Sequence, residues 1–194
     1  MFRLKLPTDP RWANIAESNL PNILSDHAWC EHKAASNALM LITMLPEHPE
    51  IVKQLHEIAL EELEHFKQVH QIIIDRGFKL DRPCKDDYVN ELMKFITKGG
   101  VRNHYIADRM LFAAMIEARS CERFKVLSNK IKDDFLAQFY RELMISEANH
   151  YKAFLDFAKQ IAPKEFNVKE RWEQWLAYEA QIIQNYGTKS EIHG

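Results

Sequence analysis

Two short stretches of the sequence combine glutamate and histidine at a helical spacing. The stretch EELEHF contains Glu62 and His65, and the stretch SEANHY contains Glu147 and His150. Residues three apart lie on the same side of an α-helix, so each Glu-x-x-His pair presents a carboxylate and an imidazole together. These groups are oxygen and nitrogen ligands for divalent transition metals. The two pairs therefore indicate metal binding.

A single glutamate precedes each pair, and its position matches that of the pair. Glu31 lies about four helical turns before Leu45, and Glu62 lies about four turns after Pro49. At the α-helical rise, each of these two helix segments, from glutamate to turn, is about 20 Å long. In an antiparallel helix pair with its turn at residues 45–49, Glu31 and Glu62 therefore share one level.

The second half of the chain repeats this geometry. Glu117 lies about four turns before Ile131, and Glu147 lies about four turns after Lys132. Alanine and large apolar residues surround all four glutamates at helical spacing, so the carboxylates should point into an apolar interior. Unpaired buried charge is very costly, and a cation is expected there.

One glutamate from each of two helices, with Glu-x-x-His from each of two others, is the ligand pattern of di-iron and di-manganese helix bundles. Glu31 and Glu117 would then be terminal ligands, Glu62 and Glu147 bridging ligands, with one histidine per metal. One Glu-x-x-His pair is expected about once by chance, but two pairs with matching upstream glutamates favour a metal site. The alternative is a bundle whose carboxylates reach solvent or pair with Arg and Lys. The candidate ligands are Glu31, Glu62, His65, Glu117, Glu147 and His150.

Other residues near these positions have weaker indications of function. His27 lies one turn before Glu31 and could support a ligand, although a surface or satisfied core histidine is the more common case. Cys121 and Tyr140 are better explained as core residues, since small and aromatic side chains at that spacing usually pack. Glu61 and Glu64 should belong to a solvated face.

The elements that must position these residues are helices. Apolar spacing of three and four residues, with capping and stop signals, predicts two pairs of long helices together with shorter ones. Four long helices, one long crossover and accessory N- and C-terminal helices predict an all-α, ferritin-like four-helix bundle. The expected ranges are 10–20, Ser25 or Asp26 to Leu45, Pro49 to Arg76 with a stop at Gly77, 88–96, 102–128, 132–161 and 165–183.

Composition bounds the class of protein. With 194 residues, 46% of them hydrophobic, the chain should form a single domain spanning residues 1–194. A net charge of −2 gives no global reason to bind nucleic acid, so such a partner would need local basic patches. Three separated cysteines without a CxxC pair argue against a disulfide framework or zinc ribbon. No stretch resembles a signal core or membrane span, so a cytoplasmic protein without a membrane partner is expected.

Three segments resemble the tRNA hydroxylase family called MiaE, and the resemblance covers nearly the whole chain. They are LFAAMIEARSCERFKVL, QFYRELMISEANHYKAFLDFA and EELEHF. The resemblance implies that the six candidate ligands bind two iron ions, that dioxygen is a co-substrate, and that a reductase or ferredoxin-type protein supplies electrons. It also implies hydroxylation of the isopentenyl side chain of 2-methylthio-isopentenyl-adenosine, next to the anticodon of certain tRNAs.

A tRNA substrate needs phosphate contacts, and two connections between expected helices are basic. We interpret them as a candidate footprint for the anticodon loop, although solvated loop charge explains them equally well. The first connection contains Arg76, Lys79, Arg82 and Lys85; the second contains Lys98, Arg102 and His104.

Other functions share the ligand pattern. A ferritin-like iron oxidase or storage protein would need a cage-forming surface, which a sequence does not reveal. A rubrerythrin-type peroxidase is disfavoured because rubredoxin-like cysteine pairs do not occur. A di-iron quinone hydroxylase would need a membrane-seeking apolar helix. The C-terminal segment carries Trp172, Trp175, Leu176, Ile182 and Ile183, but its acidic Glu165, Glu170, Glu173 and Glu179 favour packing on the bundle.

Overall fold

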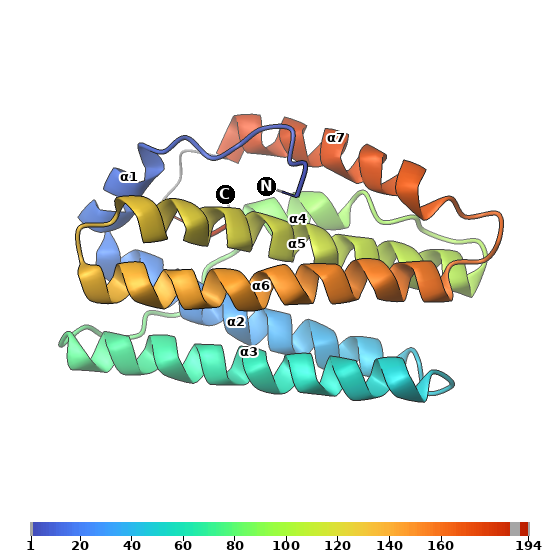
Figure 1. The fold of residues 1–194 in the computed structure, drawn as a ribbon, viewed down its shortest axis with the longest axis horizontal. Coiled ribbons are helices and arrows are strands. Elements are labelled where there is room, and N and C mark those ends of the chain that lie inside the picture. The colour runs from blue at the N-terminus through green and yellow to red at the C-terminus, as the bar shows by residue number, and fades with distance from the viewer. Residues whose placement is uncertain (1, 187–190, 194) are drawn as a thin grey trace. The chain divides into compact units, whose positions relative to one another are not determined.

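The computed structural model describes residues 2–186 and 191–193 of the chain. Within these residues it consists of α-helices and connecting loops, and no β-strand occurs among them. Figure 1 shows the helices in chain order. The helical content of the described residues confirms the predicted all-α class. The helices are α1 (Trp12–Ser18), α2 (Leu20–Thr43), α3 (Pro49–Asp75), α4 (Asp87–Met93), α5 (Arg102–Lys130), α6 (Asp134–Ile161) and α7 (Val168–Tyr186).

The start of α2 differs from the prediction. The helix begins at Leu20, five residues before Ser25, and has a proline in its first turn. Proline is well tolerated there because its missing N–H would have no partner inside the helix. The hydroxyl of Ser25 is not an N-cap; it accepts a hydrogen bond from the backbone N–H of Asp81 at 3.2 Å. Ser25 therefore fastens the loop after α3 to α2.

The end of α3 agrees with the prediction to within one residue. Gly77 has a φ of +69°, in the left-handed region that favours glycine. The N–H of Gly77 bonds to the carbonyl of Ile74, and the N–H of Phe78 bonds to that of Ile73, both at 2.9 Å. This is the Schellman arrangement, which satisfies the last carbonyls of the helix.

The chain forms two compact units. The α2–α3 unit comprises Ala16–Lys85 and Ser190–Ile192, and the α5–α6 unit comprises Met1–Ile15, Asp86–Lys189 and His193–Gly194. Each contains one of the two expected long-helix pairs. The single-domain organisation of residues 1–194 stays a prediction.

In the α2–α3 unit, the two helices form an antiparallel hairpin closed by a short turn (Figure 1). Their facing sides are apolar at helical spacing, and Leu24, Leu41, Leu55 and Val69 are buried. Burial of each such side chain stabilises the fold by about 1.5–3 kcal/mol, so α2 and α3 are held together along their length.

In the α5–α6 unit, α5 pairs with α6 along its length and also contacts α4 and α7. Because α5 has neighbours on several sides, most of its residues are buried. The apolar side chains of the C-terminal helix α7 are buried too, as its predicted packing requires: Trp172, Trp175, Leu176, Ile182 and Ile183. No described helix is long and apolar enough to span a bilayer.

A buried carboxylate ties α7 to α5. Asp108 accepts hydrogen bonds from Nε and Nη2 of Arg171 at 2.9 and 2.8 Å, and from Nε1 of Trp175 at 2.7 Å. The backbone N–H of Thr97 donates to it at 2.7 Å. Burial would raise the pKa of Asp108, but the Arg171 charge and these hydrogen bonds outweigh it and lower the pKa.

Replacing Asp108 with Asn should therefore destabilise the protein by about 2 kcal/mol at pH 7, because Arg171 loses its ionic partner. A lowered folded-state pKa contributes stability above the unfolded pKa, so the difference should shrink as the pH falls below about 4. Urea unfolding followed by circular dichroism measures both effects. The control is Asp156→Asn, which breaks an exposed pair with Lys159 and should cost less than about 0.5 kcal/mol. Equal costs for the two variants would contradict the prediction.

Candidate metal centre

Three predicted ligands of the α2–α3 unit lie together inside the hairpin. Glu31 on α2 and both Glu62 and His65 on α3 are buried. Nδ1 of His65 lies 3.4 Å from Oε2 of Glu62 and 3.8 Å from Oε2 of Glu31. Each of the three offers a ligand atom within 4.8 Å of the others. We call these residues the α2–α3 triad.

His27 supports this triad. Its Nε2 lies 2.6 Å from Oε1 of Glu31, one helical turn further along α2. Burial would raise the pKa of Glu31, but the hydrogen bond with His27 and the nearby His65 outweigh it and hold the pKa well below its usual range. Glu31 is therefore ionised at neutral pH, with one oxygen fixed by His27. The sequence had indicated this contact as the less common of two interpretations of His27.

The other three predicted ligands form an equivalent group in the α5–α6 unit. Glu117 on α5 and both Glu147 and His150 on α6 are buried. Each offers a ligand atom within 4.8 Å of the other two. We call these residues the α5–α6 triad. The sequence thus predicted which three residues come together within each unit and which helices carry them.

Two neighbours of the α5–α6 triad have packing roles. Cys121 is fully buried, and its Sγ lies 3.0 Å from the carbonyl oxygen of Met144. Burial raises the pKa of the Cys121 thiol to about 12, and the charge of Glu147 adds to the effect, so the thiol stays protonated. Tyr140 is buried against the ring of Phe124. Both side chains therefore pack in the core, as their spacing in the sequence predicted.

Sequence reasoning missed a buried ionic cluster on the same helix as Glu117. Nε of Arg119 donates to Glu179 on α7 at 2.8 Å, and its Nη1 donates to Glu122 at 2.9 Å. Its Nη2 reaches the carbonyl oxygen of Leu6 at 3.0 Å. The only sequence signal is the charged run within EARSCER, which alone does not indicate burial. The Arg119 cluster holds α7 and the N-terminal segment to α5.

The predicted basic footprint divides between the units. Lys79, Arg82 and Lys85 are exposed and Arg76 is half-buried, all in the loop after α3; Lys98 and Arg102 are exposed near the start of α5. His104 is half-buried, and its Nε2 lies 3.5 Å from Oε1 of Glu165. Along α5, Arg102 lies about 22 Å from Glu117 at the helical rise. The loop after α3 instead folds back on α2, where the carbonyl of Asp81 accepts from Nε1 of Trp29 at 2.8 Å.

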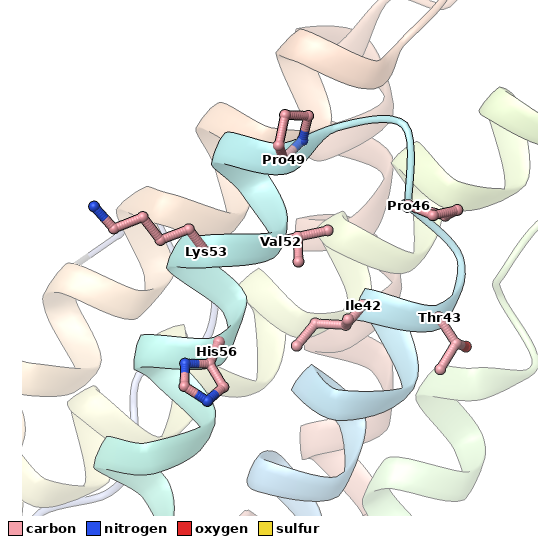
Figure 2. A pocket seen from close by; sticks show the side chains of 7 residues that line it. All are labelled: Ile42, Thr43, Pro46, Pro49, Val52, Lys53 and His56. Carbon is pink, nitrogen blue, oxygen red and sulfur yellow. The ribbon is translucent and has the colours of Figure 1, made fainter.

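A depression of about 710 Å³ lies at the opposite end of the hairpin from this loop, where α2 turns into α3. Figure 2 shows its lining side chains, which come from both helices and the turn: Ile42, Thr43, Pro46, Pro49, Val52, Lys53 and His56. Its lining includes no triad residue, and the lining residue nearest to Glu62 along α3 is His56, about 9 Å before it. The depression is therefore separate from the α2–α3 triad.

The donor set of each triad fits iron or manganese. Two carboxylates and one imidazole form a mixed oxygen and nitrogen set, which suits these metals better than the thiolate-rich sets of structural zinc. Two buried carboxylates per triad also favour a bound cation, since burying uncompensated charge is costly.

Comparisons with known proteins give consistent results. Residues 2–194 match the family model described as tRNA-(MS[2]IO[6]A)-hydroxylase (MiaE). A tRNA 2-(methylsulfanyl)-N(6)-isopentenyladenosine(37) hydroxylase from Pseudomonas putida is 34% identical over 193 residues, which is 98% of this chain and 91% of that protein. A hydroxylase with the same description from Salmonella typhimurium is 28% identical, over 87% of this chain and 80% of that protein.

A solved structure also resembles the chain. It is described as protein 43 with aldehyde deformylating oxygenase activity, from Synechococcus. The two are 32% identical with a TM-score of 0.89, over 98% of this chain and 95% of the other. This likeness confirms the predicted ferritin-like fold class.

Proposed function

The chain belongs to the MiaE family of tRNA hydroxylases, and on that premise we propose that it is a di-iron, dioxygen-dependent monooxygenase acting on tRNA. Its substrate would be 2-methylthio-isopentenyl-adenosine next to the anticodon, and its product would carry a hydroxyl on the isopentenyl chain. The observation that carries this proposal is the pair of buried Glu, Glu and His triads in a chain of this family.

We propose that the two triads together hold two iron ions. Glu31 and Glu117 would be terminal ligands, Glu62 and Glu147 bridging ligands, and His65 and His150 would each bind one iron. The distance from glutamate to turn is about the same in all four helix segments, which supports this assignment, as does the donor chemistry of each triad. Iron bound there would supply the activation of dioxygen and the attack on an unactivated C–H bond.

The chain's own residues would orient and protect this chemistry. His27 holds Oε1 of Glu31, and the other oxygen of Glu31 would bind the metal. Buried apolar side chains one helical turn from the triad residues, such as Ile58 and Phe154, would exclude water from the reacting prenyl group. Electrons would come from a reductase or ferredoxin-type partner.

The substrate would present its modified base from a single-stranded loop. Enzymes that act on bases take the base out of the stack, and the anticodon loop makes this easier because its bases are already unpaired. Arg76, Lys79, Arg82, Lys85, Lys98 and Arg102 are the proposed phosphate contacts. The four residues of the loop after α3 have the better support, since that loop returns along α2 to Trp29.

Nucleoside mass spectrometry tests this function directly. Iron-loaded, chemically reduced protein with dioxygen should convert the prenylated adenosine of tRNA to a species heavier by one oxygen atom. The same tRNA lacking the prenyl group should stay unchanged. No conversion by protein whose iron is bound and reoxidised by dioxygen would reject the tRNA substrate and favour a ferritin-like oxidase or storage function.

One relative favours a second candidate. The Synechococcus protein, 32% identical, is described as having aldehyde deformylating oxygenase activity. The same triads in this chain could serve oxygen chemistry on an aldehyde. The two candidate functions can be distinguished by incubating the reduced, iron-loaded protein with such an aldehyde and measuring hydrocarbon by gas chromatography. We expect the protein to convert tRNA and not the aldehyde.

A further inference from the structure

Four aromatic rings gather on the outside of the α2–α3 hairpin, and we call them the aromatic cluster. Trp29 and His32 come from α2, and Phe66 and His70 come from α3. The ring centroids of Trp29 and His32 lie 5.7 Å apart, and those of Trp29 and Phe66 lie 6.0 Å apart. His70 stacks on Phe66 at 5.9 Å with an interplanar angle of 14°. The cluster therefore links the two helices with ring faces and edges.

These rings are accessible to solvent. His32 is exposed, and Trp29, Phe66 and His70 are half-buried. The other three tryptophans of the chain, Trp12, Trp172 and Trp175, are buried, with exposed fractions of 1%, 7% and 0%. An accessible group of aromatic rings offers flat apolar surfaces, and nucleobases stack on such surfaces.

The basic loop after α3 lies against this cluster. Nε1 of Trp29 donates to the carbonyl of Asp81, which fixes the indole ring beside the loop. Trp29 and the exposed Arg82 line the same pocket, which has a volume of about 350 Å³. Acidic groups of the α2–α3 unit, Asp26, Asp81 and Glu191, also line it. These acidic groups would suit a base with amino groups better than a bare phosphate. Arg82 could contact a phosphate of the RNA backbone.

The aromatic cluster lies at the level of the α2–α3 triad. Trp29 and His32 are two residues before and one residue after Glu31, and Phe66 directly follows His65. At the helical rise, Trp29 and His32 lie within about 3 Å of Glu31 along α2. Along α3, Phe66 lies about 1.5 Å beyond His65 and about 6 Å beyond Glu62, and His70 lies about 7.5 Å beyond His65. A nucleotide held by the cluster would therefore be close to the level at which the prenyl group must react.

We propose that the aromatic cluster is a base-stacking subsite for unpaired nucleotides of the anticodon loop, with Arg82 as its phosphate contact. This subsite rests on the proposed tRNA hydroxylase function. The cluster holds neighbouring bases by stacking on Trp29 and Phe66, which leaves the modified adenosine free to leave the stack. Stacking tolerates different bases, so this subsite would bind the loop without strong sequence preference.

Binding of an anticodon stem-loop RNA to the iron-loaded full chain tests the proposal. Trp29→Leu and Phe66→Leu should each weaken binding by about 10-fold, the size of one lost stack, with no change in the slope of log Kd against log salt. Charge reversal at Arg82 and Lys85 should weaken binding and reduce that slope. Trp29→Phe keeps an aromatic ring and should retain most of the affinity.

Matched controls separate stacking from general damage. Phe135→Leu removes an exposed phenyl ring on α6, with 61% of its surface accessible, and should leave affinity unchanged. Iron content and helicity must match those of wild type in every variant, because Glu31 and His65 are close. Stem-loop RNA should also quench the tryptophan emission of wild type, and Trp29→Phe should abolish this quenching because Trp29 is the accessible tryptophan.

The outcomes distinguish this subsite from the proposed function. Unchanged affinity in both Leu variants, with tRNA still hydroxylated by wild type, would overturn the subsite and leave the function intact. Equal weakening by Phe135→Leu would also overturn it. If wild-type protein neither binds the stem-loop nor hydroxylates tRNA, both proposals are wrong.

Discussion

The Glu62→Ala protein is expected to lose both iron ions and all tRNA hydroxylation while keeping its helical content. Glu62 is fully buried in the α2–α3 triad, and as a bridging ligand it would bind both metals. Removing a residue that only supports a ligand typically costs about 10–100-fold in metal affinity, so loss of a shared ligand should cost more. Iron per chain, measured by plasma emission spectrometry after gel filtration, should fall to background.

The neighbouring glutamate provides the control. Glu61 lies one residue earlier on α3 and is exposed, so Glu61→Ala should keep full iron and activity. Iron stoichiometry also tests the bridging role. Retention of one iron per chain in Glu62→Ala would mean that the α5–α6 triad binds its own metal and that Glu62 is not shared. Full retention of both would remove Glu62 from the site.

The sequence predicted the helices and the two triads because both follow from short-range periodicity. Glu62 and His65 are three residues apart, and their place on the buried face follows from the apolar residues around them. Glu31 and Glu62 are about equally far from the turn at residues 45–49, which predicted that they lie at one level. The stop at Gly77 was also predictable, because a positive φ at a helix end favours glycine.

Features that depend on tertiary packing were not predictable. Ser25 resembles an N-cap, but Pro21 begins the helix earlier and Ser25 bonds to a loop 56 residues away. The aromatic cluster requires the register between α2 and α3, which a single helix does not reveal. Charged residues are usually exposed, so nothing local in the sequence showed that Arg119 and Glu179 are fully buried.

The second large effect is expected from Arg119→Met. Arg119 and Glu179 have 0% exposed surface. Burial would lower the pKa of Arg119, but the charges of Glu179 and Glu122 raise it above its usual value. Removing the guanidinium leaves two carboxylates without their cation, and breaking a buried ion pair in this way costs about 3–5 kcal/mol. Urea unfolding should show a stability loss of about 4 kcal/mol.

An exposed arginine is the control for lost charge. Arg141 lies on the exposed face of α6, so Arg141→Met should change stability by less than about 0.5 kcal/mol. A loss below about 1 kcal/mol in Arg119→Met would contradict the prediction.

A double variant shows whether the cost comes from uncompensated charge or from lost packing. Glu179 also accepts a hydrogen bond from the hydroxyl of Tyr88 at 3.1 Å, so Glu179→Met alone should also destabilise the protein. Combined with Arg119→Met, it removes both charges of the pair, and the double variant should be less destabilised than the sum of the single variants by about 2 kcal/mol. Strict additivity of the two stability losses would contradict the ionic account.

Arg119 is two residues after Glu117, so Arg119→Met should also lower iron affinity. The double variant should recover part of that loss.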